Sequence, residues 1–384
     1  MGAIRIAILG GGQLGRMFIE NALRYNVAID VMDADPSAPC ARLADRFVVG
    51  SLNDREAVIE FGRNADVIGL EIEHMSVEGL EALKEMGKTV IPDPSVLRTI
   101  QDKGLQKEFY REHGIPSSPY ALIGSEKELS SHDLFPAFLK TRRGGYDGKG
   151  VMPLNDAGSF ISGDWKWPSV LEKKVDVQLE LAVIVVRNGK GTQITYDPVE
   201  MVFDPRFNLV DHLRAPARIS KELQTKARKL AARVAEAFAH PGVYAVELFL
   251  SKEGELLVNE TAPRAHNSGH HTIEACSSSQ FDQLLRLYMG WPLGDPTLNV
   301  PAAMINLVGE NGSGAAMVKG LDDVLHMPGT FVHLYGKQET RTGRKMGHIT
   351  VTAGDPAQLD QAIAVTKVHC RIVPAEERQT QPSA

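Results

Sequence analysis

The sequence predicts a fold of the α/β and α+β classes, built from three consecutive domains. Strand and helix patterns alternate through the first hundred residues, which is typical of a parallel, doubly wound sheet. A second region carries strands around a glycine-rich loop, followed by one long amphipathic helix. From Val300 onward the pattern predicts a small strand-rich domain. We expect domains at residues 1–98, 99–298 (with a lid subdomain at about 118–187) and 299–384.

Composition restricts the classes of protein to which this chain can belong. Its 384 residues suffice for several cores, and 43% hydrophobic with 23% charged residues is ordinary for a soluble protein. A formal charge of -6 offers no footprint for nucleic acid or an anionic membrane. The 3 cysteines are widely spaced, and no segment resembles a signal peptide or a membrane span. These features predict a cytoplasmic protein that acts on small molecules.

In the N-terminal region, the apolar runs predict strands at Ile4–Leu9, Ala28–Asp33, Val67–Leu70 and Thr89–Ile91. Between them, the spacing of apolar residues predicts helices at Gly15–Tyr25, 53–63 and Val77–Met86. Pro92 and Pro94 interrupt this alternation and place the first domain boundary near residue 98. One helix is then expected over Thr99–His113.

In the central region, the clearest helical spacing covers Lys221–Ala239. Val246–Leu250 and Glu255–Glu260 flank a short polar turn and predict a hairpin. A last helix is expected over Ile273–Met289, and the polar tail after Pro374 is expected to be disordered.

A glycine fingerprint, Gly10-x-Gly12-x-x-Gly15, follows the first strand and opens the first helix, and Asp33 ends the next strand. Taken alone, this arrangement favours an NAD oxidoreductase. Two other interpretations stay open on this segment. The glycines can serve only the tight first turn, or the helix N-terminus can bind a different anion.

Residues 140–150 form a glycine-rich basic loop, Lys-Thr-Arg-Arg-Gly-Gly-Tyr-Asp-Gly-Lys-Gly. Glycines let the backbone wrap closely around phosphates, and the cations neutralise them. The order of a Walker loop is absent. A mobile surface loop is the plainer alternative, but Tyr146 and Asp147 among the glycines favour a lid over nucleotide phosphates.

Glu247 and Glu260 lie on opposite arms of the predicted hairpin. A four-residue turn places Glu247 opposite Val258, so both glutamates share one face, one diagonal step apart, and Asn259 points to the other. Neighbouring carboxylates repel unless a cation joins them, and Mg²⁺ shared with nucleotide phosphates suits this arrangement. Two separately solvated glutamates are the alternative.

The segment Glu260–Thr272 follows directly and is dense in hydrogen-bonding side chains. It leads into a helix, whose N-terminal amides favour an anion. We interpret it as a substrate-recognition segment, with a self-satisfied capping loop as the alternative. The spacing of His266 and His270 is open to zinc, but the HExxH pattern and a third ligand are missing.

Together these motifs resemble the ATP-grasp superfamily and, within it, the 5-(carboxyamino)imidazole ribonucleotide synthetases. The resemblance runs in order from residue 4 to about 372. It rests on Gly-Gly-Gln-Leu-Gly at 11–15, Glu71-Ile72-Glu73, Asp102-Lys103, Gly-Gly-Tyr-Asp-Gly-Lys-Gly at 144–150, Asn-Glu-Thr-Ala-Pro-Arg at 259–264, His-Asn-Ser-Gly-His at 266–270 and Gly-Arg-Lys-Met-Gly-His at 343–348. It implies a Rossmann-like N-terminal domain, a central ATP-grasp domain and a small C-terminal domain. It also implies ATP-dependent carboxylation of aminoimidazole ribonucleotide by bicarbonate.

The resemblance implies ATP and Mg²⁺ as cofactors, a homodimer, and a separate mutase that receives the product. Mg²⁺ is expected on Glu247 and Glu260. ATP is expected to contact Lys103, Lys140, Gly145, Tyr146, Asp147, Gly148, Lys149, Gly150, Val151, Glu172, Lys173, Lys174, Val175, Glu180, Phe203, Asn259 and Glu260. The ribonucleotide is expected to contact Gln13, Leu14, Glu73, Tyr146, Asp147, Arg264, His266, Asn267, Ser268, Lys337, Arg344 and Lys345. A catalytic part is expected for Asp147, Lys149, Arg264 and Lys337.

The chain departs from the family pattern at three positions. Phe203 stands where relatives commonly carry a polar histidine, so a polar contact to the nucleotide is in question there. Lys103 and Lys149 stand where relatives often carry Arg, which keeps the charge and loses the bidentate fork.

Three rival functions explain less of the sequence. An NAD-dependent dehydrogenase leaves the 140–150 loop and the paired glutamates without a role. A non-catalytic nucleotide-binding module would not need both glutamates. Another ATP-grasp ligase, such as a biotin carboxylase or a formate-using enzyme acting on glycinamide ribonucleotide, is disfavoured by the segments His266–His270 and Arg344–His348.

Overall fold

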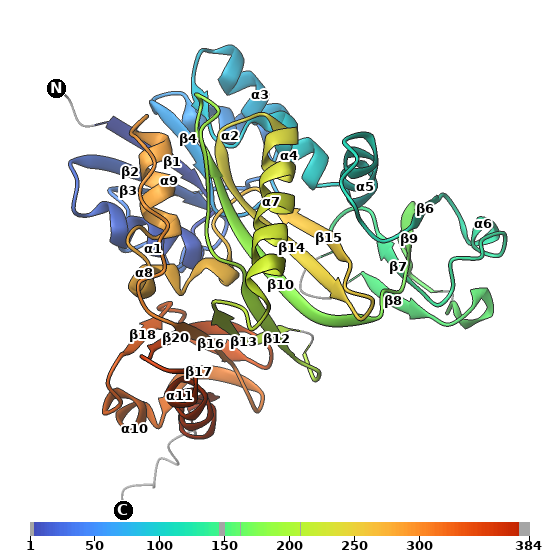
Figure 1. The fold of residues 1–384 in the computed structure, drawn as a ribbon. Coiled ribbons are helices and arrows are strands. Elements are labelled where there is room, and N and C mark those ends of the chain that lie inside the picture. The colour runs from blue at the N-terminus through green and yellow to red at the C-terminus, as the bar shows by residue number, and fades with distance from the viewer. Residues whose placement is uncertain (1–3, 146–149, 162, 208, 376–384) are drawn as a thin grey trace, which may run out of the picture.

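The computed structural model describes residues 4–145, 150–161, 163–207 and 209–375. Figure 1 shows an N-terminal sheet, a long central sheet, a smaller subdomain that projects to the right, and C-terminal strands and helices at the bottom. The predicted fold class, α/β and α+β, is confirmed. Most of the tail after Pro374 lies outside the described residues. No helix in the described part of the chain is long and apolar enough to cross a membrane.

The N-terminal domain is a five-stranded parallel sheet in the order β3-β2-β1-β4-β5. Its strands are β1 (Ile4–Leu9), β2 (Val27–Asp33), β3 (Arg46–Val49), β4 (Val67–Leu70) and β5 (Thr89–Val90). Its helices are α1 (Gln13–Ala22), α2 (Arg55–Gly62) and α3 (Val77–Glu85). The only strand that the sequence did not predict in this sheet is β3, a four-residue edge strand without a fully buried residue.

The single helix expected over Thr99–His113 is wrong, because the chain forms α4 (Pro94–Ile100) and α5 (Lys103–Glu112). Asp102 separates them. Its carboxylate accepts hydrogen bonds from the amides of Gly104 (2.9 Å) and Leu105 (3.2 Å), which caps α5 and starts a new helix.

The subdomain at the right of Figure 1 is a four-stranded antiparallel sheet in the order β6-β9-β7-β8. Its strands are β6 (Tyr120–Ile123), β7 (Ala137–Thr141), β8 (Val151–Leu154) and β9 (Ser169–Lys173), with the short helices α6 (Glu126–Leu129) and η1 (Ala157–Ser159). β7 and β8 pair at Lys140 and Val151, so the glycine-rich loop connects these two strands.

The central sheet has nine strands and continues without interruption into the C-terminal region. Its order is β15-β14-β10-β12-β13-β16-β20-β18, with β11 paired to β10. Its strands are β10 (Val177–Arg187), β11 (Gln193–Thr195), β12 (Val199–Asp204), β13 (Leu209–Ala215), β14 (Gly242–Ser251), β15 (Leu256–Ala262), β16 (Ala302–Val308), β18 (Thr330–Leu334) and β20 (Lys345–Thr352). Helix α7 (Lys221–Phe238), predicted within one residue, packs on β10 and β14.

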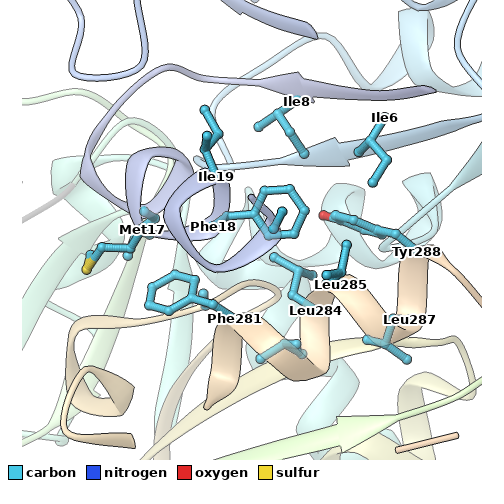
Figure 2. Close-up of a cluster of buried hydrophobic side chains, with 14 of the residues drawn as sticks. Ile6, Ile8, Met17, Phe18, Ile19, Phe281, Leu284, Leu285, Leu287 and Tyr288 are labelled. Atoms are coloured by element: carbon cyan, nitrogen blue, oxygen red, sulfur yellow. The ribbon is translucent and has the colours of Figure 1, made fainter. Parts of the chain in front are cut away.

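The helix expected over Ile273–Met289 is also divided, into α8 (Thr272–Ala275) and α9 (Gln280–Tyr288), because Ser279 caps the second helix through the amide of Asp282. α9 lies against α1 of the N-terminal domain. Figure 2 shows Phe281 and Leu285 of α9 packed with Phe18 in one apolar cluster. Each such side chain contributes roughly 1.5–3 kcal/mol when fully buried, which fixes α9 to the N-terminal core.

The C-terminal region contains more helix than its strand pattern predicts. A three-stranded sheet is formed by β17 (Ser313–Lys319), β19 (Glu339–Arg341) and β21 (Arg371–Pro374), and the helices are α10 (Leu321–Leu325) and α11 (Pro356–His369). Helix α11 was not predicted, because its apolar residues do not lie on one face: Leu359 and Ile363 are buried, whereas Val368 is exposed.

Candidate active site

The glutamates of the β14–β15 hairpin form the centre of the site. The predicted register is wrong: β15 pairs one residue further along β14, and a bulge between Val246 and Leu248 adds a second step. Glu247 therefore lies opposite Asn259 and Glu260 together. The prediction that Asn259 points away is also wrong, because its Nδ2 lies 3.5 Å from Glu247 Oε2.

The charges around this pair are unevenly balanced. Burial, followed by the carboxylates of Glu260 and Glu180, raises the pKa of Glu247. Lys103 lies with its Nζ 2.9 Å from Glu260 Oε2 and lowers the pKa of that carboxyl group. Asn259 Oδ1 is buried and accepts no hydrogen bond from the described residues. Two carboxylates and an amide oxygen are the donor set that suits a hard divalent cation.

A second charged group lies where β9 meets α5. Glu172 is buried, and its carboxylate contacts Lys140 Nζ at 3.0 Å and Lys107 Nζ at 3.1 Å. Ser118 Oγ donates to the same carboxylate at 2.9 Å. Burial alone would raise the pKa of Glu172, but Lys140 and Lys107 lower it to about 2. The expected ATP residues Lys140 and Glu172 therefore form an ion pair that orients the lysine.

The other expected nucleotide residues are distributed as follows. The amides of Lys173 and Lys174 donate to the carbonyls of Pro119 and Pro136 at 2.8 Å, and their side chains are exposed. Phe203 packs with the buried apolar cluster of the central sheet, as its apolar ring requires. Val175 is half-buried in the connection to β10.

The glycine-rich loop is anchored at both ends. Gly150 accepts a hydrogen bond from the Thr141 amide at 2.9 Å, and a Cβ at Gly150 would lie 2.4 Å from Thr141 Oγ1. Gly145, also expected to contact ATP, is half-buried. The loop residues expected to touch ATP or substrate lie outside the described residues: Tyr146, Asp147, Gly148 and Lys149.

The segment after β15 reaches across to the N-terminal domain. Arg264 makes a two-point contact with Glu73, at 2.6 and 3.1 Å. Burial opposes ionisation of Glu73, but Arg264 lowers its pKa to about 2, so this pair is charged. Two residues expected at the ribonucleotide, 191 positions apart in the chain, are thus in direct contact with each other.

The histidine of this segment is neutral and oriented. Burial, followed by Arg264 and Lys345, lowers the pKa of His266 to about 3. Its Nδ1 accepts a hydrogen bond from the Ser268 amide at 3.3 Å and faces the Ser268 hydroxyl at 2.9 Å. The ring proton is then on Nε2, which lies 3.6 Å from Glu247 Oε1.

Asn267 differs from its neighbours. Its side-chain amide exchanges two hydrogen bonds with Asn306 of β16, at 2.9 and 3.0 Å. The side-chain amide of Asn267, expected to contact the ribonucleotide, is therefore bonded to β16 and joins this segment to the C-terminal strands.

The anion position of the glycine fingerprint is filled from within the chain. Glu71 accepts a hydrogen bond from the Leu14 amide at 3.0 Å, and a Cβ at Gly12 would lie 2.5 Å from Glu71 Oε1. Asp33 accepts from the Gly11 amide at 2.7 Å. A dinucleotide would need these positions, so the geometry speaks against the NAD interpretation. Leu14 was expected to contact the substrate, and its amide is paired with Glu71; Gln13, also expected there, begins α1.

Of the C-terminal cations, Lys345 begins β20, whereas Lys337 and Arg344 lie in the connections before and after β19. Lys337 Nζ donates to the carbonyl of Lys345 at 2.7 Å, so these two residues, both expected to contact the ribonucleotide, are adjacent. Arg344 donates to the carbonyl of Glu339 at 2.6 Å. Two hydrogen bonds from Ser37 lower the pKa of Asp35, and the charge of Arg344 lowers it further. Arg344 thus lies close enough to the N-terminal domain for its charge to act on Asp35.

Comparison with known proteins identifies the family. Residues 3–101 match the ribonucleotide synthetase preATP-grasp domain, residues 108–281 the ATP-grasp domain, and residues 302–362 the phosphoribosylaminoimidazole carboxylase C-terminal domain. The N5-carboxyaminoimidazole ribonucleotide synthase of Bacillus subtilis is 37% identical over 352 residues, which cover 90% of each protein. The chain belongs to the N5-carboxyaminoimidazole ribonucleotide synthase family. It is an ATP-grasp enzyme.

Solved structures of the synthase family agree with the fold. The Thermotoga maritima synthetase is 38% identical with a TM-score of 0.88, and the match covers 97% of this chain and 100% of that one. The Aspergillus clavatus synthase, solved with ADP and 5-aminoimidazole ribonucleotide, is 32% identical with a TM-score of 0.84, and the match covers 96% and 98%.

Two residues near the site, buried Lys107 and half-buried Glu71, were not among the expected site residues of this synthase-family chain. Lys107 lies four positions after Lys103 on α5, so helical spacing already placed both lysines on one face. Glu71 lies two positions before Glu73, but its role depends on contact with the glycine fingerprint, which local pattern does not reveal.

The raised pKa of Glu247 predicts a pH effect in the metal-free protein. A carboxyl group whose folded-state pKa lies above its unfolded value favours folding below that unfolded value, and this contribution is lost as pH rises. We therefore expect wild-type stability to fall as pH rises from 4.5, the ordinary value, through the folded-state pKa of Glu247. Glu247→Gln should reduce this decline in thermal midpoints measured from pH 5 to 9.

The matched control is Glu255→Gln, in the exposed turn of the same hairpin. It should keep the wild-type pH profile. A pH profile of Glu247→Gln that parallels the wild-type profile would contradict the raised pKa assigned to Glu247.

Proposed function

We propose that this chain uses ATP and bicarbonate to carboxylate the exocyclic amine of 5-aminoimidazole ribonucleotide, a step of de novo purine synthesis. ADP, phosphate and the N5-carboxyamino product are released. The observation that carries this proposal is the meeting of two groups of residues. Glu247 and Glu260, with Lys103, lie beside the segment that holds Arg264 and His266.

A magnesium ion fits the hairpin. Glu247, Glu260 and the unsatisfied Asn259 Oδ1 would hold it, together with ATP phosphates, since Mg²⁺ is commonly bound by one or two carboxylates plus phosphate oxygens. When bound, the ion would neutralise charge that develops on the transferred phosphoryl group.

The chain's own residues then account for the first step. A bicarbonate oxygen attacks the γ-phosphorus of ATP and ADP leaves, which gives carboxyphosphate. Lys140, oriented by Glu172, and Lys103, held by Glu260, would stabilise the phosphate oxygens by charge-assisted contacts. Carboxyphosphate hydrolyses readily, so exclusion of water by the glycine-rich loop would favour transfer.

In the second step, the exocyclic nitrogen attacks the carboxyl carbon, phosphate leaves, and the nitrogen loses a proton. We assign Asp147 to orient this amine or accept its proton, and we assign Tyr146 and Lys149, its near neighbours in the sequence, to the same step. Arg264 and neutral His266 would orient the imidazole and the carboxyl group. Lys337, Arg344 and Lys345 would hold the ribose phosphate.

The test is ADP formation by the purified protein with ATP, Mg²⁺ and bicarbonate, with and without aminoimidazole ribonucleotide. Strong dependence on the ribonucleotide is expected. Turnover that depends instead on glycinamide ribonucleotide with formate, or on biotin, would assign the chain to another ATP-grasp ligase. Under the same proposal, the protein is a homodimer and its product passes to a separate mutase.

Arg344→Ala is expected to raise the KM for aminoimidazole ribonucleotide about ten- to a hundred-fold, because a charge-assisted contact to the ribose phosphate is lost. The KM for ATP should stay close to the wild-type value, since this cation lies in the turn between β19 and β20 of the C-terminal region. Arg341→Ala, on the neighbouring strand β19, is the matched control and should leave both constants unchanged. A rise in the ATP constant alone would place Arg344 at the other substrate.

A further inference from the structure

The catalytic segment after β15 leaves the central sheet before it reaches its most important side chains. β15 ends at Ala262, and η2 (Asn267–Gly269) begins only five residues later. Arg264 and His266 lie in between, on backbone that belongs to no strand. Such a backbone keeps its side chains in position only if other groups satisfy and hold it.

At the end of β15, just before this segment, a buried glutamine of α5 holds the backbone. Gln106 Oε1 accepts a hydrogen bond from the Thr261 amide at 3.2 Å, and its Nε2 lies 3.5 Å from the Thr261 carbonyl. Tyr110 donates to the same Oε1 at 3.0 Å and contacts Thr261 Oγ1 at 2.7 Å. The contact is adjacent to Glu260, at the bulge where the strand pairing shifts.

At the other end, a buried glutamine of α9 does the same. Gln280 Oε1 accepts from the His266 amide at 2.9 Å, and its Nε2 donates to the His266 carbonyl at 2.9 Å. The Nε2 also lies 3.1 Å from Nδ1 of His270. A Cβ at Gly269 would lie 2.3 Å from Gln280 Oε1, so glycine permits this close approach.

The two glutamines belong to different cores. α5 packs on the central core, where Phe109 stacks on Phe238 with ring centroids 4.3 Å apart. α9 packs on the N-terminal core through Phe281, as Figure 2 shows. The backbone from Thr261, in β15, to His266 is therefore held at each end by the side-chain amide of a glutamine from a different core.

We propose that Gln106 and Gln280 are positioning residues with separate tasks: Gln106 sets Glu260 for the nucleotide and its metal, and Gln280 sets His266 for the ribonucleotide. This inference rests on the proposed function. Its distinctive consequence is a split between the two substrates, because each glutamine holds the backbone on one side of Arg264. A purely structural role would lower stability and shift both substrates alike.

The chain offers a matched control on the same helix. Gln283 is fully buried, lies one turn after Gln280, and exchanges the same two backbone hydrogen bonds, with Gly294, at 2.9 and 3.0 Å. Gly294 lies in the loop after α9 and in no part of the assigned site. Gln283→Met therefore matches the loss of hydrogen bonds and stability without touching the catalytic segment.

The experiment compares Gln106→Met, Gln280→Met and Gln283→Met by steady-state kinetics for each substrate. Gln280→Met should raise the KM for aminoimidazole ribonucleotide about ten-fold and the KM for ATP less than about two-fold. Gln106→Met should show the reverse split of about ten-fold for ATP. Gln283→Met should shift neither constant. Identical profiles for Gln280→Met and Gln283→Met, or equal shifts for both substrates, would overturn the proposal.

A second measurement needs no substrate. Hydrogen exchange at the amides of Thr261 and His266 should be faster in the Gln106 and Gln280 variants, respectively, than in Gln283→Met. If the wild type fails to consume ATP with the ribonucleotide, the proposed function is wrong. Hydrogen exchange alone then tests whether the two glutamines hold the backbone at Thr261 and His266. Equal exchange in variants and control would reject it. Should a Met variant not fold, the corresponding Asn variant, which withdraws the amide by one methylene, is measured in the same way.

Discussion

Glu260→Gln is expected to lower the turnover of ATP by about 100-fold or more, the range seen when one preorganised electrostatic group is removed from a site. The substitution keeps the shape of the side chain but removes the charge that a cation needs at the hairpin. It also leaves Lys103 without the carboxylate that holds it at 2.9 Å. The measurement is ADP formation at saturating substrates, alongside a thermal melt that verifies folding.

Two controls make this result specific. Glu255→Gln makes the same chemical change on the same hairpin, in an exposed turn, and should turn over ATP normally. Raising Mg²⁺ should recover part of the Glu260→Gln activity if the loss lies in metal affinity. Near-normal ADP formation by a folded Glu260→Gln protein would remove the metal assignment.

Glu172→Gln is expected to destabilise the protein by about 3–5 kcal/mol, because removing one partner of a buried ion pair leaves the others uncompensated. Here two lysines depend on one carboxylate, and the exposed fractions of the Lys107 and Glu172 side chains are 3% and 5%. The pKa of Glu172 is about 2, so its contribution is present at neutral pH and is lost only as pH falls toward that value. Urea unfolding at pH 7 measures the change.

The comparison for this prediction is a surface ion pair. Glu60 pairs with Arg63 at 2.7 Å, and more than half of each side chain is exposed. Glu60→Gln should cost less than about 1 kcal/mol, because water screens exposed charges. If both substitutions lower the free energy of unfolding by the same small amount, the charges of Lys107 and Lys140 do not depend on Glu172. The assignment of Glu172 as the residue that orients Lys140 would then be wrong.

Local pattern was sufficient wherever one segment's own residues decide the outcome. Val67–Leu70 is apolar and buried throughout, and Ile4–Leu9 is apolar except for Arg5 and buried from Ile6 onward, so both strands were predicted to the residue. The repeat of apolar residues through α7 predicted that helix within one residue. Side-chain alternation made Glu247 and Glu260 candidates for one site, although the predicted register was wrong. The motifs between residues 11 and 348 carried the family resemblance, which the comparisons confirm.

The tertiary structure alone decided how these candidates meet, because the deciding contacts join residues far apart in the chain. The bulge that turns Asn259 toward Glu247 has no local signal, since it arises from the pairing of two strands. Lys103 reaches Glu260 across 157 positions, and Gln106 reaches Thr261 across 155. Glu71 fills the glycine fingerprint from the end of another strand and removes the space that a dinucleotide needs. Residue pattern along the chain specifies which atoms are available, and only packing in three dimensions determines which of them face one another.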